Sequence, residues 1–288
     1  MSGTSVALDD PDWRRTVAEG ASVALFVASS ALGVAFGVVG WKLFGIAWVA
    51  FLAMAGGATF GGRRRGRDAG ALVWGYGVAS GAMVTSAALF LLPQALSIGG
   101  RFGGVGVAAG LLVGFGSHTV GHRLSHLDLP GDRTVLQLTA HSAAAGAIIG
   151  VIYGNMPDLG PLLGLAIVSH KAPAGYAAAS RLRRNGGHVG TLLVPAVGVG
   201  LAAVFASVVA LPASSAFRGI VFGFAAGVFL HVAMDFLPRC EVGSEIHDAL
   251  GAADDADAHA LLDRLRTQAV ISTAVGAAAV LVGWLTVA

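Results

Sequence analysis

The sequence predicts an all-α polytopic membrane protein with about nine transmembrane helices. Hydrophobic residues make up 55% of the 288 residues and charged residues only 12%, about half the charged share of a soluble domain. The apolar residues fall in long stretches, and a bilayer core about 30 Å thick needs about 20 of them per helix. No stretch alternates with a period of two, which disfavours an outer-membrane barrel. These features exclude an ordinary soluble enzyme, a disordered chain and a nucleic-acid-binding protein.

Nine apolar stretches are the predicted spans. They cover residues 20–40, 44–62, 70–96, 103–119, 134–154, 160–181, 189–211, 216–238 and 267–287. The first stretch is longer than the 7–15 residues or so of a signal-peptide core, so we expect a retained helix and no cleaved leader. We divide the chain into an N-terminal segment with one extra helix and a transmembrane domain with two inner loops. Their bounds are 1–43 and 44–288, with the loops at 119–133 and 239–266.

The basic residues predict the orientation, because cytoplasmic loops carry an excess of Lys and Arg. With the N-terminus inside, fourteen of the 18 basic residues fall on the cytoplasmic side and three outside, and Lys171 lies within a span. We therefore expect a multi-pass protein of the cytoplasmic membrane with its C-terminus outside. The inner loop 239–266 is acidic, and solvation is its expected role, with weak cation collection as the alternative. Within it, Asp257–Leu265 is expected to form an amphipathic helix leading into the last span.

An internal repeat links the third and eighth spans. Residues 77–92 and 223–238 share six identities: Gly77/Gly223, Ala79/Ala225, Gly81/Gly227, Ala87/Ala233, Phe90/Phe236 and Leu91/Leu237. Five spans separate the copies, so they run in opposite directions, as in the inverted repeats of many transporters. A shorter pattern, H-x-A-x-A-G, begins at His141 and again at His170, in spans five and six. We therefore expect inverted three-helix units around a central helix pair.

Ionisable side chains inside the spans are candidate functional residues, because a bilayer makes them costly. They are His141, His170, Lys171, His231 and Asp235, with Gln137 and Ser142 as polar neighbours. Neutral imidazole suits Zn, Cu, Fe and Ni, so three His and one Asp favour a metal or proton pathway. The alternative is that each histidine is a hydrogen-bonded core residue.

Helical spacing groups these residues. Gln137 lies one turn before His141, and His231 lies one turn before Asp235, which either shares a cation with it or orients the imidazole. Lys171 argues against a cation site because a buried ammonium repels cations. Snorkelling or pairing with Asp235 is an equal alternative for it. We also expect Pro173 to kink the sixth span.

The inner end of the fourth span carries a second group of histidines. His118, His122 and His126 follow one another at four-residue spacing, so a helical extension would place them on one face. This pattern predicts a low-affinity metal site, with a solvated helix end as the alternative. The chain has no G-x-x-x-x-G-K-[ST] phosphate loop, so we expect no nucleotide partner. It also lacks the H-E-x-x-H and G-x-S-x-G motifs, so we expect no enzymatic activity.

Residues 44–288 resemble the ZIP (Zrt/Irt-like) family of divalent metal transporters. The motifs H-S-A-A-A-G at His141 and H-K-A-P-A-G at His170 are similar to the H-N-x-P-E-G-like motifs of its two central helices. The segment Gly81–Leu96 resembles the family's second helix, and Phe229–Pro238 resembles its seventh. The resemblance implies eight ZIP-like helices plus the additional N-terminal one.

The resemblance also implies roles for individual residues. His141 and His170 match metal ligands, and Ser142 stands in place of Asn as at most a weak ligand. Lys171 replaces a second-site ligand and is expected to act as a fixed cation in place of a second metal. Four further positions depart from the family pattern: Gln94, Ala145, Ala174 and His231. We expect one metal site, built from His141 and His170 with Asp235 or His231.

The predicted function is therefore transport of a divalent cation, with zinc as the expected substrate and no permanently bound cofactor. Its expected partners are the lipid bilayer and the ion, and a homodimer is left open. Two alternatives remain: a non-transporting ZIP-like protein that acts as a sensor or partner, and a transporter of another solute.

Overall fold

The protein is described by a computed structural model covering residues 11–63, 69–124, 132–212, 214–235, 237–238 and 255–286. Within these ranges all regular secondary structure is helical. The elements are α1 (Pro11–Ala35), α2 (Trp41–Arg63), α3 (Ala69–Ser86), the π-helical turn η1 (Ala87–Leu91), α4 (Leu92–Gly99), α5 (Arg101–Leu124), α6 (Arg133–Asn155), α7 (Pro161–Val168), α8 (Lys171–Arg184), the 3₁₀ turn η2 (Val189–Leu192), α9 (Leu193–Ala206), α10 (Ser215–Asp235) and α12 (Asp255–Leu285).

Seven helical segments among the described residues are long and apolar enough to cross a bilayer. They are α1, α2, the run α3–η1–α4, α6, the run η2–α9, α10 and α12. Large apolar side chains such as Phe36, Leu112 and Val270 are exposed, as expected of surfaces that contact lipid. The expectation of an all-helical, membrane-embedded chain is confirmed at this level.

The described residues account for seven of the nine predicted spans. The fourth predicted span corresponds to α5, of which the part with described side chains, Arg101–Ser117, is apolar but shorter than the seven segments above. The sixth, residues 160–181, is divided into the short helices α7 and α8. Pro173 does not cause this division, because it lies in the first turn of α8, where a missing N–H costs no helical hydrogen bond.

Several predicted boundaries also move. Helix α1 spans Pro11–Ala35 rather than 20–40. The expected helix Asp257–Leu265 is confirmed as helical: it belongs to α12, which runs from Asp255 into the last span without a break. The predicted inner loop 119–133 is shortened because α5 continues to Leu124. Residues 239–254 of the other predicted loop lie outside the described residues.

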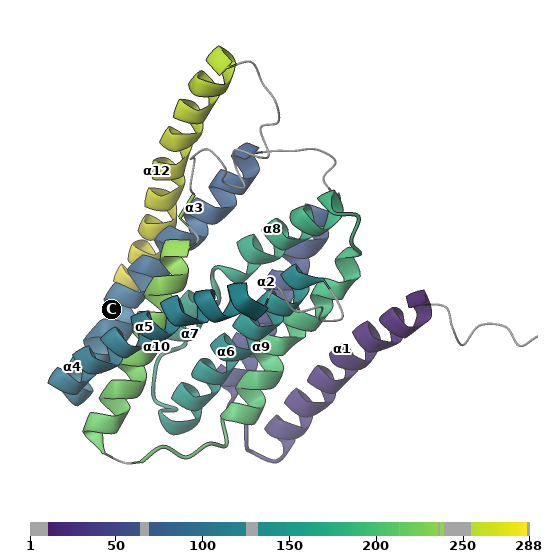
Figure 1. Cartoon of the computed structure of the whole chain (residues 1–288). Coiled ribbons are helices and arrows are strands. Elements are labelled where there is room, and N and C mark those ends of the chain that lie inside the picture. Colours follow the sequence, from purple (N-terminus) through teal and green to yellow (C-terminus); the bar gives the residue numbers. More distant parts are fainter. Residues whose placement is uncertain are drawn as a thin grey trace, which may run out of the picture.

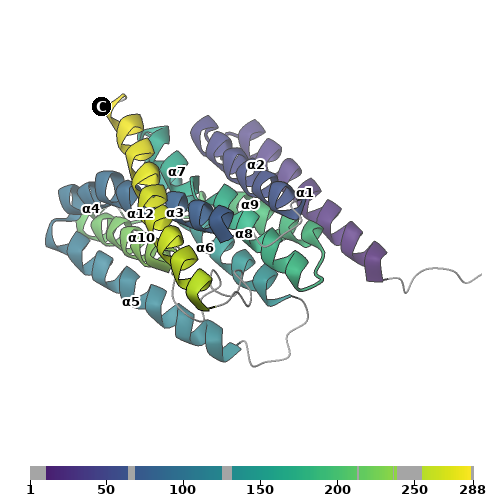
Figure 2. The same cartoon turned by 90° about the horizontal axis from the view of Figure 1, so that it is seen from above.

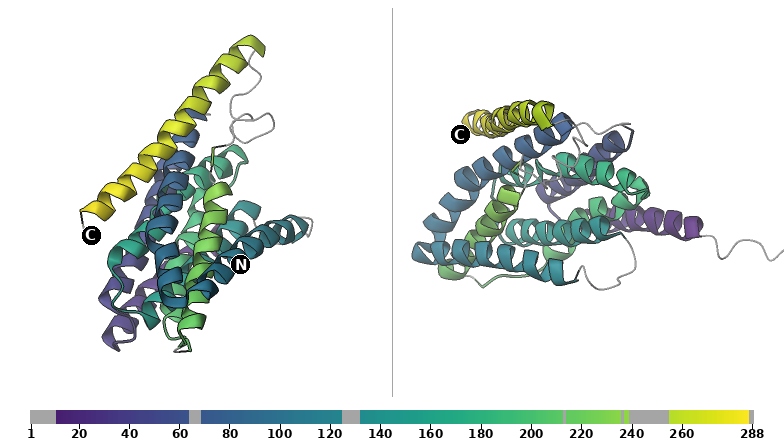
Figure 3. Two further views of the ribbon diagram at one scale, coloured as in Figure 1. Left: turned by 90° about the vertical axis from the view of Figure 1, so that its left-hand side faces the viewer. Right: turned by 45° about the horizontal axis from the view of Figure 1, so that its top comes forward.

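The bundle is built from closely packed helix pairs. The most extensive packing joins α5 with α10, α3 with α12, α6 with α9, and α2 with α8, and α12 lies along α3 on one side of the bundle (Figures 1 and 3). A glycine in each pair allows the backbones to approach. A Cβ atom would lie within 2.2 Å of a carbonyl oxygen of the partner helix at Gly57, Gly81, Gly110 and Gly150. The abundant glycines thus serve close helix packing.

Helix α1 lies at the edge of the bundle (Figure 2), where it packs mainly on α9. Its anchor is Phe26, which is fully buried. The ring lies over Gly200, where a Cβ would approach it to 2.2 Å, and its centroid is 5.0 Å from that of Trp48. This packing fixes α1 against the rest of the chain.

Candidate functional site

The break between α7 and α8 is the first feature of the site. Helix α7 ends at Val168, Ser169 and His170 form a turn, and α8 begins at Lys171. The His170 carbonyl accepts a hydrogen bond from the Ala174 N–H at 3.0 Å, so α8 starts directly at the turn. The carbonyl end of one half-helix and the amide end of the next therefore meet at His170. Such discontinuous helices form the binding sites of many transporters.

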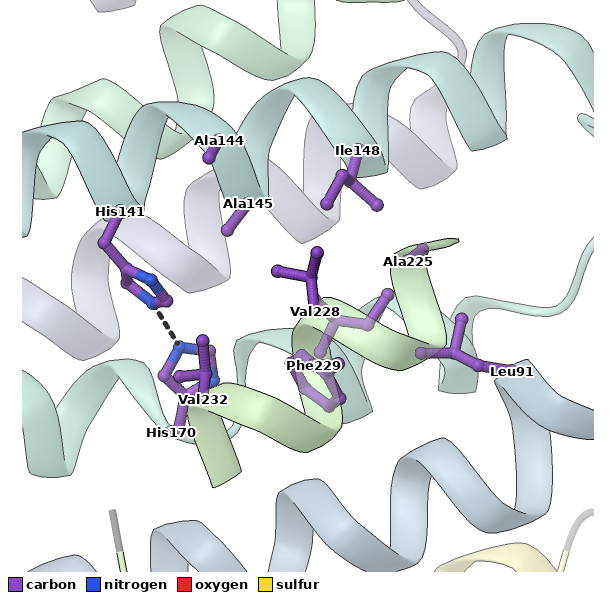
Figure 4. A pocket seen from close by; sticks show the side chains of 11 residues that line it. Leu91, His141, Ala144, Ala145, Ile148, His170, Ala225, Val228, Phe229 and Val232 are labelled. Carbon is purple, nitrogen blue, oxygen red and sulfur yellow. Dashed lines mark hydrogen bonds between the residues drawn. The ribbon is translucent and has the colours of Figure 1, made fainter. Parts of the chain in front are cut away.

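His170 faces His141 of α6 (Figure 4). The two Nε2 atoms are 3.3 Å apart, and the rings are tilted by 67°. His170 is fully buried, and its ring meets Phe229 of α10 edge-on, with centroids 5.8 Å apart. The repeated H-x-A-x-A-G motif therefore brings its two leading histidines together.

The Nε2–Nε2 distance is compatible with two chemical states. A neutral imidazole that carries its proton on Nε2 can donate it to the other ring at this distance. Alternatively, Zn–N bonds of about 2.0–2.1 Å at a tetrahedral angle separate two nitrogens by about 3.3–3.4 Å. An ion could therefore replace the shared proton with little side-chain movement.

A small cavity lies beside the two imidazoles. Its volume is about 30 Å³, enough for one or two water-sized spheres. The lining residues are Leu91, His141, Ala144, Ala145, Ile148, Ile167, His170, Ala225, Val228, Phe229 and Val232. No carboxylate is among them. Leu91 belongs to the π-helical turn η1, and such turns are frequent at functional sites.

Lys171 is the most unusual buried group near this cavity. Its side chain is 0% exposed, and within the described residues its Nζ has no hydrogen-bond partner. The predicted pairing with Asp235 is not formed, and the complete burial contradicts snorkelling. An uncompensated buried ammonium is costly and repels any cation held by the imidazoles.

His231 and Asp235 form a separate pair on α10. Their Nε2 and Oδ2 atoms are 3.3 Å apart, as the spacing predicts. The imidazole packs on Gly114 of α5, where a Cβ would lie 2.6 Å from its ring. Val228 and Val232, on a different face of α10, line the cavity instead.

The structure therefore does not assemble the predicted site from His141, His170 and either His231 or Asp235. Within the described part of the chain, no three His, Cys, Asp or Glu side chains come together in a group that could hold one ion. Val228 and Val232 lie on the face of α10 that lines the cavity, whereas His231 and Asp235 do not. The spacing of residues along α10 does not predict which of its faces meets the cavity.

The remaining predicted residues lie away from the cavity or outside the description. Ser142 is buried, and its hydroxyl lies 3.8 Å from Sδ of Met54 on α2. Gln137 is exposed on α6. His118 and His122 belong to α5, but their side chains lie outside the described parts, as does all of His126.

Sequence reasoning missed Glu19, which is buried at 9% exposure. The predicted first span began at residue 20, whereas α1 begins at Pro11 and contains Glu19. Proline is preferred at the first position of a helix, so Pro11 was the signal that could have extended the span. Glu19 Oε1 lies 3.6 Å from Nδ1 of His188.

No protein-family model and no curated protein sequence matches this chain.

Proposed function

We propose that the protein is a ZIP-like integral membrane transporter of divalent metal cations, zinc first among them. The ion binds between His141 and His170. The observation that carries the proposal is the 3.3 Å separation of their Nε2 atoms, because it equals the nitrogen spacing of a tetrahedral zinc site. The position of the pair at a helix break, inside a membrane-embedded bundle, supports transport rather than static binding.

The helix pairing supports an inverted repeat. The sequence repeat equates α3 with α10, and extending it along the chain equates α2 with α9 and α5 with α12. The H-x-A-x-A-G motif that begins at His141 and again at His170 equates α6 with the α7–α8 segment. Under this correspondence the pair α3–α12 becomes α10–α5, and α2–α8 becomes α9–α6. These are the four most extensive packings in the bundle.

The repeated glycines follow the same correspondence. Gly77 and Gly81 pack on Ser272 and Thr273 of α12. Their counterparts in the repeat pack on α5, through the contacts Gly223 with Gly103 and Gly227 with Val107. Two similar halves around a central pair provide the architecture for alternating access, in which one unit rocks against the other.

The site holds one ion weakly. Two neutral imidazoles supply two ligands, water in the cavity supplies the others, and none of the lining residues that the structure describes offers a negative charge. The nearby Lys171 ammonium takes the place of a second metal. We place the protein in the cytoplasmic membrane with its N-terminus inside and C-terminus outside, as the basic residues predict. A ZIP-like protein that binds the ion without moving it is the alternative within this proposal.

One observation favours a second candidate, the transport of an anionic solute. The Lys171 Nζ has no hydrogen-bond partner among the described residues, and Lys171 is the first residue of α8. A buried cation at the positive end of a half-helix is suited to an anion. In this case the histidines would donate hydrogen bonds to the solute.

Reconstitution into liposomes tests the metal-transport proposal. Uptake of Zn²⁺, Mn²⁺ and Fe²⁺ is followed for the wild type and for His141→Ala, His170→Ala and Lys171→Glu. We expect zinc uptake that falls to the level of empty vesicles in either histidine variant and rises in Lys171→Glu. Wild-type uptake no greater than that of empty vesicles would refute metal transport, and uptake that survives both histidine substitutions would refute the site.

A further inference from the structure

We infer that Glu19 and His188 form a second metal site, separate from the cavity, at the contact between α1 and η2. The site takes a divalent transition ion such as Zn²⁺, with one carboxylate and one imidazole from the protein and water at the other positions. It does not depend on the transport proposal, because its residues lie outside the cavity lining.

The carboxylate of Glu19 is the first element of this site. It lies in the apolar segment Arg15–Ala35 of α1, which is long enough to cross a membrane, and its side chain is 11% exposed. Within the described residues Oε1 is buried and has no hydrogen-bond partner. An ionisable side chain in such a position is costly and is retained for a function with a specific partner.

The imidazole of His188 is the second element. Its Nδ1 lies 3.6 Å from Glu19 Oε1, which is too long for a normal N–H···O hydrogen bond of about 2.7–3.2 Å. Zn–N and Zn–O bonds of about 2.0–2.2 Å span a gap of about 3.3–3.6 Å, so one ion fits between the two atoms. The His188 side chain is 59% exposed, which gives an ion from water access to the pair.

Gly190 leaves room for the carboxylate. A Cβ at this position would lie 2.7 Å from Glu19 Oε2 and 2.8 Å from Cε1 of His188. Both ligands are also held by fixed elements, since Phe26 anchors α1 and His188 is the N-cap of η2. Because His188 lies between α8 and α9, a bound ion would tie α1 to the connection that follows the broken helix.

Equilibrium binding of Zn²⁺ to the purified full-length protein, prepared without a polyhistidine tag, tests the inference. The measurement uses a His141→Ala/His170→Ala background, so the cavity site does not contribute. We expect E19Q and H188A each to weaken one zinc-binding event by tenfold or more, because replacing residues around a bound metal commonly lowers its affinity 10- to 100-fold. The matched control D158N changes an exposed acid and should bind as the background does.

A third variant guards against misfolding. G190A adds a methyl group in η2 that displaces the ends of the Glu19 and His188 side chains rather than any backbone atom. It should therefore weaken the same binding event with little change in thermal stability without metal. Unaltered zinc binding in E19Q and H188A would overturn the inference. Loss of the zinc-binding event in E19Q and H188A would support the second site. If the wild type and the His141→Ala/His170→Ala background bind zinc equally, the cavity site is refuted while the second site stands.

Discussion

Replacing Lys171 with Met gives the sharpest test of how charge limits the cavity site. Methionine has similar length and is apolar, so Lys171→Met removes the ammonium while largely keeping the volume of a side chain that is 0% exposed. A divalent and a monovalent cation about 8 Å apart repel by about 4 kcal/mol at an effective dielectric constant of about 20. Relief of even a third of this repulsion strengthens zinc binding about tenfold.

The same substitution should also stabilise the metal-free protein. A buried polar group without a hydrogen-bond partner costs about 1–3 kcal/mol, and a charged one more. Within the described residues Lys171 Nζ is such a group. We therefore expect Lys171→Met to raise the thermal unfolding temperature by a few degrees.

Zinc titration calorimetry and thermal unfolding in detergent measure the two effects. Lys42→Met is a matched control, because Lys42 Nζ donates hydrogen bonds to the carbonyls of Pro157 and Leu159 at 2.9 and 3.2 Å. It should leave zinc affinity unchanged and lower the unfolding temperature. Zinc affinity that falls in Lys171→Met would refute the reasoning, since it would make the amine itself a ligand.

Three further predictions concern packing and the division of the site. Gly110→Ala should destabilise the protein by about 1–3 kcal/mol, because its Cβ would lie 2.2 Å from the Phe224 carbonyl oxygen. The control is Gly104→Ala on the same helix, whose Cβ meets nothing within 4 Å. Equal unfolding temperatures for the two variants would contradict the described packing. His231→Ala should leave zinc affinity at the cavity unchanged, because the ring packs on Gly114. If calorimetry shows a loss of zinc affinity as large as that in His170→Ala, His231 belongs to the site. Ala145→Glu should raise zinc affinity at least tenfold by adding a carboxylate to the cavity lining. Unchanged zinc affinity in the same titration would argue against an ion in this cavity.

The helical segments could be predicted from the sequence because their signal is local. Each apolar stretch is long enough to be recognised by itself, and seven of the nine predicted stretches correspond to helical segments that could span a membrane. The division at Ser169 and His170 could not be predicted, because residues 160–181 are continuously apolar apart from the site residues. The half-helix α8 is held by its packing on α2, where Gly57 approaches the Ala172 carbonyl, and this contact joins segments far apart in the chain.

The candidate site was predicted in part for a similar reason. The repeated motif identified His141 and His170, and the structure brings their rings together. The orientation of His231 depends on Gly114 of another helix, which spacing within α10 does not reveal. Glu19 was missed because counting apolar residues places the start of a span after a charge, at residue 20, whereas the helix itself begins nine residues earlier at Pro11.

Zinc K-edge X-ray absorption of the purified protein observes directly whether His141 and His170 hold the ion. The measurement uses the E19Q/H188A variant loaded with one equivalent of zinc, so that only the cavity site is observed. We expect two imidazole nitrogens at about 2.0–2.1 Å, with oxygen atoms as the remaining zinc neighbours. The imidazole signal should be lost when His141 and His170 are both replaced by Ala. A zinc environment that is the same before and after this replacement would contradict the claim that these two histidines hold the ion.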